Sequence, residues 1–227
     1  MMRKKTEGNV SENLTIQNGK LFPKFIIVVG ALICFGFIAL RVAEMLSTGG
    51  TIPFDETVRH WVYDHRSPLA SAIFIPVTHA GDWQTITVLG AFLLVIPATR
   101  RKIGLPFAIV SLLSTMAYKE VKGFFQRPRP ELEVRLIPQG GYSFPSGHSM
   151  NCIVCFGILI YLIRRYCPNR RVANVLTVLL SLLIIGIGTS RVYVGVHFPT
   201  DVLGGWSLGL AFLFTSIIIL EIIRGEA

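Results

Sequence analysis

Long apolar runs dominate this chain and limit it to a fold built inside a membrane. A transmembrane helix needs about 20 apolar residues, and about 17 are enough where the bilayer is thin. With 52% hydrophobic and only 15% charged residues, the chain is unlike a soluble domain. The sequence therefore predicts an all-α integral membrane bundle of six transmembrane helices. The expected spans are Phe25–Leu40, Trp83–Thr99, Gly104–Tyr118, His148–Ile163, Val172–Thr189 and Phe198–Ile223.

Residues 1–23 precede the first span and are mostly polar. Their Asn, Glu, Thr and Lys side chains are typical of a segment that cannot bury enough apolar surface to fold. We expect a disordered cytoplasmic tail over residues 1–23 and a single six-span membrane domain over residues 24–227.

An apolar stretch between the first two spans, Ser67–Gly81, is broken by Pro76. Its apolar part would reach only about 21 Å as a helix, because a helix rises 1.5 Å per residue. We predict an extra short helix on the outer side, either half-buried in the bilayer or a kinked extension of the second span. Asp82 is expected to cap that span and His79 to lie at the interface, with contact to a lipid headgroup as the alternative.

Basic residues gather in alternate loops. Cytoplasmic loops of membrane proteins carry an excess of Lys and Arg, so these loops and both termini are expected in the cytoplasm of a multi-pass plasma-membrane protein. The net charge of +9 raises nucleic acid as a partner, but the charges are divided among separate loops and we expect none. The cytoplasmic set is Arg3, Lys4, Lys5, Lys20, Lys24, Arg100, Arg101, Lys102, Arg164, Arg165, Arg170, Arg171 and Arg224.

Three polar clusters interrupt the apolar chain, at Lys122–Pro130, Pro145–His148 and Ser190–Asp201. No span separates the first two clusters, and two spans separate the second from the third. All three therefore face the same side of the membrane, which the charge pattern makes the extracytoplasmic side. Ionisable groups at membrane depth are costly and usually functional.

The first two clusters suit a phosphate. Lys122 and Arg129 supply cations at the end of the third span, and arginine offers a planar fork of donors that matches phosphate oxygens. Ser146 and Gly147 open the fourth span, where a helix N-terminus presents unpaired N–H groups to an anion. His148 follows them and could deliver a proton.

The third cluster adds a nucleophile and another cation. Asp201 follows His197 by four residues, so a turn can bring the carboxylate to one imidazole nitrogen. That contact fixes the tautomer and leaves the other nitrogen free to attack. Arg191 ends the fifth span nearby. Each cluster alone has an ordinary structural explanation: headgroup-level anchors, a Ser N-cap and a structural His–Asp pair. All three explanations would have to be true at once, for clusters on one face of the membrane, so the functional interpretation is favoured.

The order Lys-x6-Arg-Pro, Pro-Ser-Gly-His and Ser-Arg-x5-His-x3-Asp resembles the type-2 phosphatidic acid phosphatase superfamily. The resemblance implies that His197 forms a phosphohistidine, that Asp201 orients it, and that His148 acts first as acid and then as base. It also implies catalysis without a metal or other cofactor. The groups implied to hold the phosphoryl oxygens are Lys122, Arg129, Ser146, Gly147 and Arg191.

The expected function is hydrolysis of a lipid phosphate at the extracytoplasmic surface of a bacterial plasma membrane. The resemblance implies phosphatidylglycerophosphate as substrate, with undecaprenyl diphosphate as the alternative. A non-catalytic transporter of anionic lipids and a phosphotransferase with another acceptor are the competing hypotheses. The sequence leaves the oligomeric state open.

Overall fold

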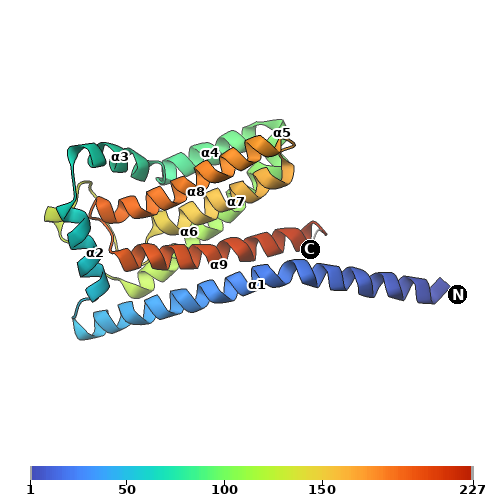
Figure 1. Cartoon of the computed structure of the whole chain (residues 1–227), viewed down its shortest axis with the longest axis horizontal. Helices are drawn as coiled ribbons and strands as arrows, with labels where there is room; N and C mark the ends of the chain where they lie inside the picture. Colours follow the sequence, from blue (N-terminus) through green and yellow to red (C-terminus); the bar gives the residue numbers. More distant parts are fainter. Residues whose placement is uncertain (1, 226–227) are drawn as a thin grey trace.

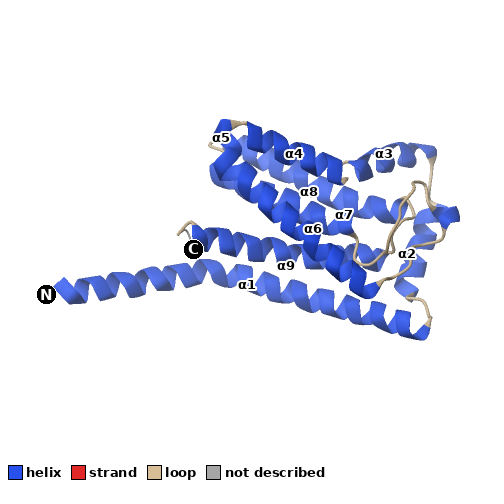
Figure 2. Ribbon diagram, turned by 180° about the vertical axis from the view of Figure 1, so that it is seen from behind, coloured by secondary structure: helices blue, strands red, loops and turns tan. Residues whose placement is uncertain are grey.

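The structure is a computed structural model that describes residues 2–225, with side-chain environments for residues 21–225. Every regular element in that part of the chain is a helix, which confirms the all-α prediction (Figure 2). The elements are α1 (Met2–Thr48), α2 (Pro53–Asp64), α3 (Pro68–His79), α4 (Trp83–Val95), α5 (Pro97–Thr99), the π-helical turn η1 (Arg100–Gly104), α6 (Leu105–Phe125), the 3-10 turn η2 (Leu132–Val134), α7 (Gly147–Tyr166), α8 (Arg170–Tyr193) and α9 (Pro199–Ile223).

Among the described residues, four helical segments are long and apolar enough to cross a bilayer: residues 21–48 of α1, and α7, α8 and α9. The 12-residue α3 and 13-residue α4 are apolar but shorter. The 21-residue α6 is long enough, at roughly 30 Å, and carries charged residues in its last two turns. The chain is therefore a multi-pass membrane protein.

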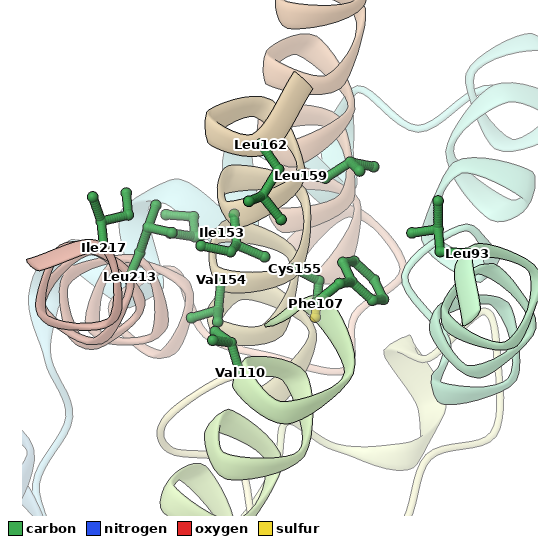
Figure 3. Packing of buried hydrophobic residues seen from close by; sticks show 11 residues of the cluster. Leu93, Phe107, Val110, Ile153, Val154, Cys155, Leu159, Leu162, Leu213 and Ile217 are labelled. Atoms are coloured by element: carbon green, nitrogen blue, oxygen red, sulfur yellow. The ribbon is translucent and has the colours of Figure 1, made fainter. Parts of the chain in front are cut away.

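Helix α7 lies at the centre of the bundle and packs against α6, α8 and α9. In Figure 3, Val154 and its neighbours on α7 lie between Leu213 of α9 and Val110 of α6. Over the apolar window of each helix, 56% of α7 is buried but only 11% of α1. Close van der Waals packing holds helices together in lipid, so α7 is the rigid centre on which the others are arranged.

Small residues let α9 approach the beginning of α7. A Cβ on Gly205 would lie 2.6 Å from the Ser146 carbonyl oxygen, which is too close for any other residue type. The Ser146 N–H also donates to the Asp201 carbonyl oxygen at 3.0 Å. The first turns of α7 and α9 are thereby fixed together at one end of the bundle.

Helices α2 and α3 build the remainder of that end. α2 runs across the bundle, and α3 packs on α8 and continues along the same side as α4 (Figures 1 and 2). Residues 67–81 contain α3, and both arrangements expected for this stretch stay predictions. Asp82 is the N-cap residue of α4, as predicted, although its side chain makes no capping hydrogen bond.

The start of α1 differs from the expectation for residues 1–23. α1 is helical from Met2 and extends past the end of α9 (Figures 1 and 2) where disorder was expected. Adding a residue to an existing helix costs far less than starting one, so the apolar span can propagate its helix into the polar residues. Lys24 pairs with Glu221 of α9 at 2.6 Å, which ties α1 to the bundle from that position. The domain boundary at residue 24 stays a prediction.

Candidate active site

The three polar clusters meet at the end of the bundle where α2 lies, around the ring of His197. His197 is only 1% exposed. Its pKa is held well below the usual range by burial and then by the nearby groups of Arg129, Lys122, Arg191 and His148. The structure thus brings together side chains from the end of α6, the start of α7, the end of α8 and the loops between them.

The contacts of His197 define which ring nitrogen is unprotonated. The Nη1 of Arg129 donates to its Nε2 at 3.0 Å, and its Nδ1 lies 3.2 Å from the Asp201 carboxylate. A guanidinium can only donate, so Nε2 must carry the lone pair and Nδ1 must carry the proton given to Asp201. Nε2 is therefore a neutral imidazole nitrogen positioned beside a cation, as a nucleophile toward phosphorus requires.

Asp201 is held from several directions. As the third residue of α9 it accepts the backbone N–H of Phe198 at 2.8 Å, and the Ser143 hydroxyl donates to the same carboxylate oxygen. The Ser143 hydroxyl also lies 3.4 Å from the His197 Nδ1. The start of α9 therefore fixes the carboxylate, and the carboxylate in turn orients the imidazole.

A buried ion network supports Asp201 from behind. Arg127 donates to Asp201 at 2.7 Å and to Asp55 of α2, also at 2.7 Å. Asp55 in turn accepts the N–H and hydroxyl of Thr200 at 2.8 Å and 2.7 Å. Arg127 and both carboxylates are at most 2% exposed. The sequence interpretation missed Asp55, Arg127 and Thr200.

Arg129 is anchored by backbone oxygens beside the nucleophile. Its Nη1 also donates to Val196 at 2.7 Å, and its Nε donates to Gly140 and Gly141 at 3.1 Å and 3.0 Å. Burial lowers the pKa of Arg129 to about 10, so it stays charged at neutral pH. The turn that carries Val196 depends on Gly195, whose φ of +76° favours glycine.

Arg191 is buried and retains an unused donor. Its Nη1 and Nη2 donate to Thr78 and to the Gln139 side chain, each at 2.6 Å. Its Nε is buried with no hydrogen-bond partner among the described residues. A buried N–H without a partner is costly, and a phosphoryl oxygen in the site would satisfy it.

The start of α7 and the end of α6 complete the cation site. The Ser146 hydroxyl accepts the Ser149 N–H at 3.3 Å, so Ser146 is the N-cap of α7 and the first N–H groups of that helix remain available. A Cβ on Gly147 would lie 2.8 Å from the Tyr118 ring. The Lys122 ammonium lies 5.8 Å from the centre of that same ring, within cation–π range.

His148 has a carboxylate partner outside the three clusters. Its Nε2 lies 2.8 Å from one oxygen of Asp82, and the other Asp82 oxygen lies 2.7 Å from the Nδ1 of His79. The sequence interpretation considered His79 and Asp82 only as a cap, an interfacial residue or headgroup contacts. Both residues are instead joined to the predicted acid–base histidine.

An apolar groove leads away from the site between α4 and α6. It has a volume of about 660 Å³ and is lined by Gly81 and Trp83 at one end and by Leu94 and Phe107 further along. Tyr118 also lines the groove. Its ring packs against Gly147 and lies 5.8 Å from the Lys122 ammonium. The groove therefore begins beside the cation site and continues between α4 and α6 as far as Leu94 and Phe107.

All eight predicted site residues lie at this end of the bundle, and the missed residues are their partners. Arg127 could have been found from sequence, because it shares the Arg-Pro-Arg-Pro run with Arg129. Asp55, Asp82 and Thr78 have no such local signal. Their partners are distant in sequence and meet them only after α2 and α3 have packed.

Comparison with known proteins identifies the family of this chain. Residues 101–223 match the family model of the PAP2 superfamily. Phosphatidylglycerophosphatase B of Bacillus subtilis is 30% identical over 183 residues, which cover 77% of this chain and 87% of that protein. An undecaprenyl-diphosphatase of Sulfolobus acidocaldarius is 33% identical over 140 residues, covering 60% of this chain and 62% of that protein.

Two solved structures are also similar to this chain. The crystal structure of a transmembrane PAP2-type phosphatidylglycerolphosphate phosphatase from Bacillus subtilis superimposes with a TM-score of 0.71 at 28% identity, covering 85% of this chain and 96% of that one. LpxE of Aquifex aeolicus gives a TM-score of 0.58 at 25% identity, covering 71% of this chain and 93% of that one. With a family match over more than half its length and these relatives, the chain belongs to the PAP2 superfamily.

Proposed function

We propose that the chain is an integral-membrane lipid phosphate phosphatase that works through a phosphohistidine at His197. The observation that carries the proposal is the neutral, Asp-oriented imidazole whose unprotonated Nε2 lies beside Arg129. A binding protein or transporter needs cations for an anionic lipid, but it needs no oriented nucleophile.

In the first step, Nε2 of His197 attacks phosphorus and the bond from phosphorus to the lipid oxygen breaks. His148 gives its proton to the departing alkoxide, and Asp201 stabilises the positive ring of the phosphohistidine. Arg129, Arg191 and Lys122 bind the three equatorial oxygens as negative charge spreads over them. Such preorganised charges are usually the largest electrostatic contribution to catalysis.

In the second step, water attacks phosphorus and the bond from phosphorus to His197 breaks. The now neutral His148 accepts the proton of that water, which restores it for the next cycle. Free phosphate leaves, and His197 returns to its neutral form. Acid and base are therefore the same residue used in sequence, and no cofactor takes part.

The groove between α4 and α6 supports a lipid as substrate. Its apolar lining suits a hydrocarbon chain whose phosphate lies at the cations, and Trp83 at its mouth is 72% exposed. The Bacillus relative named for phosphatidylglycerophosphate supports that lipid, with phosphatidylglycerol and phosphate as products. The Sulfolobus relative supports undecaprenyl diphosphate as the second candidate with the same chemistry.

Phosphate release from a panel of lipids tests the proposal. Purified protein in detergent micelles would be given phosphatidylglycerophosphate, phosphatidic acid and undecaprenyl diphosphate, each with EDTA present. We expect release from all three without added metal, with the highest kcat/KM for phosphatidylglycerophosphate. Binding without release would favour a transporter, and phosphate appearing on an added alcohol would favour a phosphotransferase.

We also propose six membrane crossings, by α1, by α4 together with α5, and by each of the helices α6 to α9, with the basic turn η1 on the cytoplasmic side. The short α3 would extend the second crossing on the outer side, and α2 would lie along the interface. The basic loops support cytoplasmic termini and an extracytoplasmic site in the plasma membrane of a bacterium.

Single cysteines at two exposed prolines test this orientation. Pro138 precedes α7 in the site loop, and Pro168 joins α7 to α8. In a background without the four native cysteines, Pro138→Cys should react with a membrane-impermeant maleimide in intact cells. Pro168→Cys should react only after the cells are broken. The reverse pattern would invert the topology.

A further inference from the structure

Asp82 lies between two imidazoles at the edge of the site. It accepts from Nε2 of His148 at 2.8 Å and from Nδ1 of His79 at 2.7 Å. The His79 side chain is 56% exposed, the Asp82 side chain 31% and the His148 side chain 19%. The three groups thus form one hydrogen-bonded row that leads from the exposed His79 to the proposed acid–base histidine.

The backbone is built to bring this carboxylate to His148. Asp82 follows Gly81 in the link between α3 and α4. A Cβ on Gly81 would lie 2.7 Å from Ile187 of α8 and 3.2 Å from the His148 ring. Only glycine lets the link approach α7 and α8 this closely. The contact between Asp82 and His148 is therefore a consequence of packing at Gly81.

The Asp82 carboxyl is ionised at neutral pH. The hydrogen bond from His148 is the main cause that lowers the pKa of Asp82 to about 2, and the bond from His79 adds to it. An ionised carboxylate accepts hydrogen bonds only, so the His148 Nε2 must carry a proton. The charged groups that act on His148 are Asp82 from the α3–α4 link, Lys122 from α6 and Arg191 from α8. Asp82 is the anion among them.

We propose that Asp82 is a positioning residue that keeps the proton on Nε2 of His148 and so reserves Nδ1 for both proton transfers. The inference rests on the proposed function and assigns a second Asp–His pair to it, for the acid–base residue rather than the nucleophile. The imidazolium that protonates the alkoxide forms between two cations, and the carboxylate stabilises it. The same contact leaves the Nδ1 lone pair to accept the proton of the water in the second step.

A substrate that needs no acid separates this role from a structural one. The alkoxide of a lipid is a poor leaving group and must be protonated, whereas p-nitrophenolate leaves without a proton. In Asp82→Asn, kcat/KM for phosphatidylglycerophosphate should fall by about 10²-fold, the lower end of what a positioned acid contributes. With p-nitrophenyl phosphate, the loss in the first step should be no more than a few fold. His148→Ala should show the same dependence on the leaving group.

The pH profile gives a second readout. A general acid must be protonated, so activity toward the lipid falls as the pH rises and the acid loses its proton. Without the carboxylate, the protonated form is less stable beside Lys122 and Arg191. The alkaline limb of kcat/KM should therefore move to lower pH in Asp82→Asn and stay near its wild-type position in Asp82→Glu.

Controls keep the outcomes distinct. Glu133→Gln removes an exposed carboxylate from the 3-10 turn η2 and should leave both activities unchanged. Asp82→Ala replaces the Asn variant if that variant fails to fold. Equal losses on both substrates, or no loss on either, would overturn the role of Asp82. A wild-type protein that releases no phosphate from any lipid would instead overturn the proposed function.

Discussion

Replacing His197 by alanine is expected to lower phosphate release by a factor on the order of 10⁴ or more, because the variant has no group to form the covalent intermediate. No other described imidazole can substitute for it. His148 is held by Asp82, and its role is to move protons. Turnover of phosphatidylglycerophosphate and of p-nitrophenyl phosphate should both be lost, unlike the selective loss expected at Asp82.

The alanine variant is also expected to fold. Arg129 would keep its bonds to the Val196, Gly140 and Gly141 carbonyls, and Asp201 would keep Arg127 and the Phe198 N–H. Its melting temperature should therefore stay near that of the wild type. His60→Ala is the matched control, since that imidazole lies on α2 and is 69% exposed. Turnover by His197→Ala at wild-type rate, or an acid-labile phosphoenzyme in that variant, would refute the nucleophile.

Trapping provides direct evidence for the same residue. When ³²P-labelled substrate is quenched within milliseconds, label on the wild-type protein should be stable in alkali and lost in acid, as a phosphoramidate is. The label should be absent from His197→Ala. A label that survives acid would indicate a phosphoserine or phosphothreonine, and the proposed first step would be wrong.

The residues proposed to contact phosphate are marked by motifs in the sequence, but most of the residues that hold them are not. Lys122, Arg129, His148 and His197 lie in short motifs whose local order already defines which ends of the spans meet. Asp55 and Asp82 meet their partners 72 and 66 residues away. Those contacts depend on how α2 and α3 pack, and no periodicity in the sequence describes that packing.

The fold, like the site, could be predicted from sequence only in part. Apolar runs predicted the long helices, because a spanning segment must satisfy its backbone internally as a helix. The apolar run of the third span ends at Tyr118, but the helix that contains it, α6, continues to Phe125. Lys119, Glu120 and Lys122 end the apolar run without ending the helix, because Lys and Glu are good helix formers. That extra length is what carries Lys122 into the site.

Replacing Arg127 by methionine is expected to destabilise the fold more than removing any surface charge. Arg127 is the guanidinium that Asp55 and Asp201 share, and all three groups are at most 2% exposed. Methionine has a similar length but leaves both carboxylates buried without their cation. Breaking a buried ion pair from one side costs about 3–5 kcal/mol. At roughly 2–4 °C per kcal/mol for a chain of this size, the melting temperature in micelles should fall by roughly 10 °C.

A double-mutant cycle shows whether the loss of stability comes from the two carboxylates that are left without a cation. Asp55→Asn removes one of the two stranded charges, so Arg127→Met combined with Asp55→Asn should be more stable than the sum of the two single changes predicts. Arg41→Met is the control, because Arg41 and Glu44 are 52% and 59% exposed and such a pair contributes about 0–1 kcal/mol. Because Arg127 also holds the carboxylate that orients His197, kcat should fall with stability. If Arg127→Met melts no lower than Arg41→Met, the network around Asp201 does not hold the active site together.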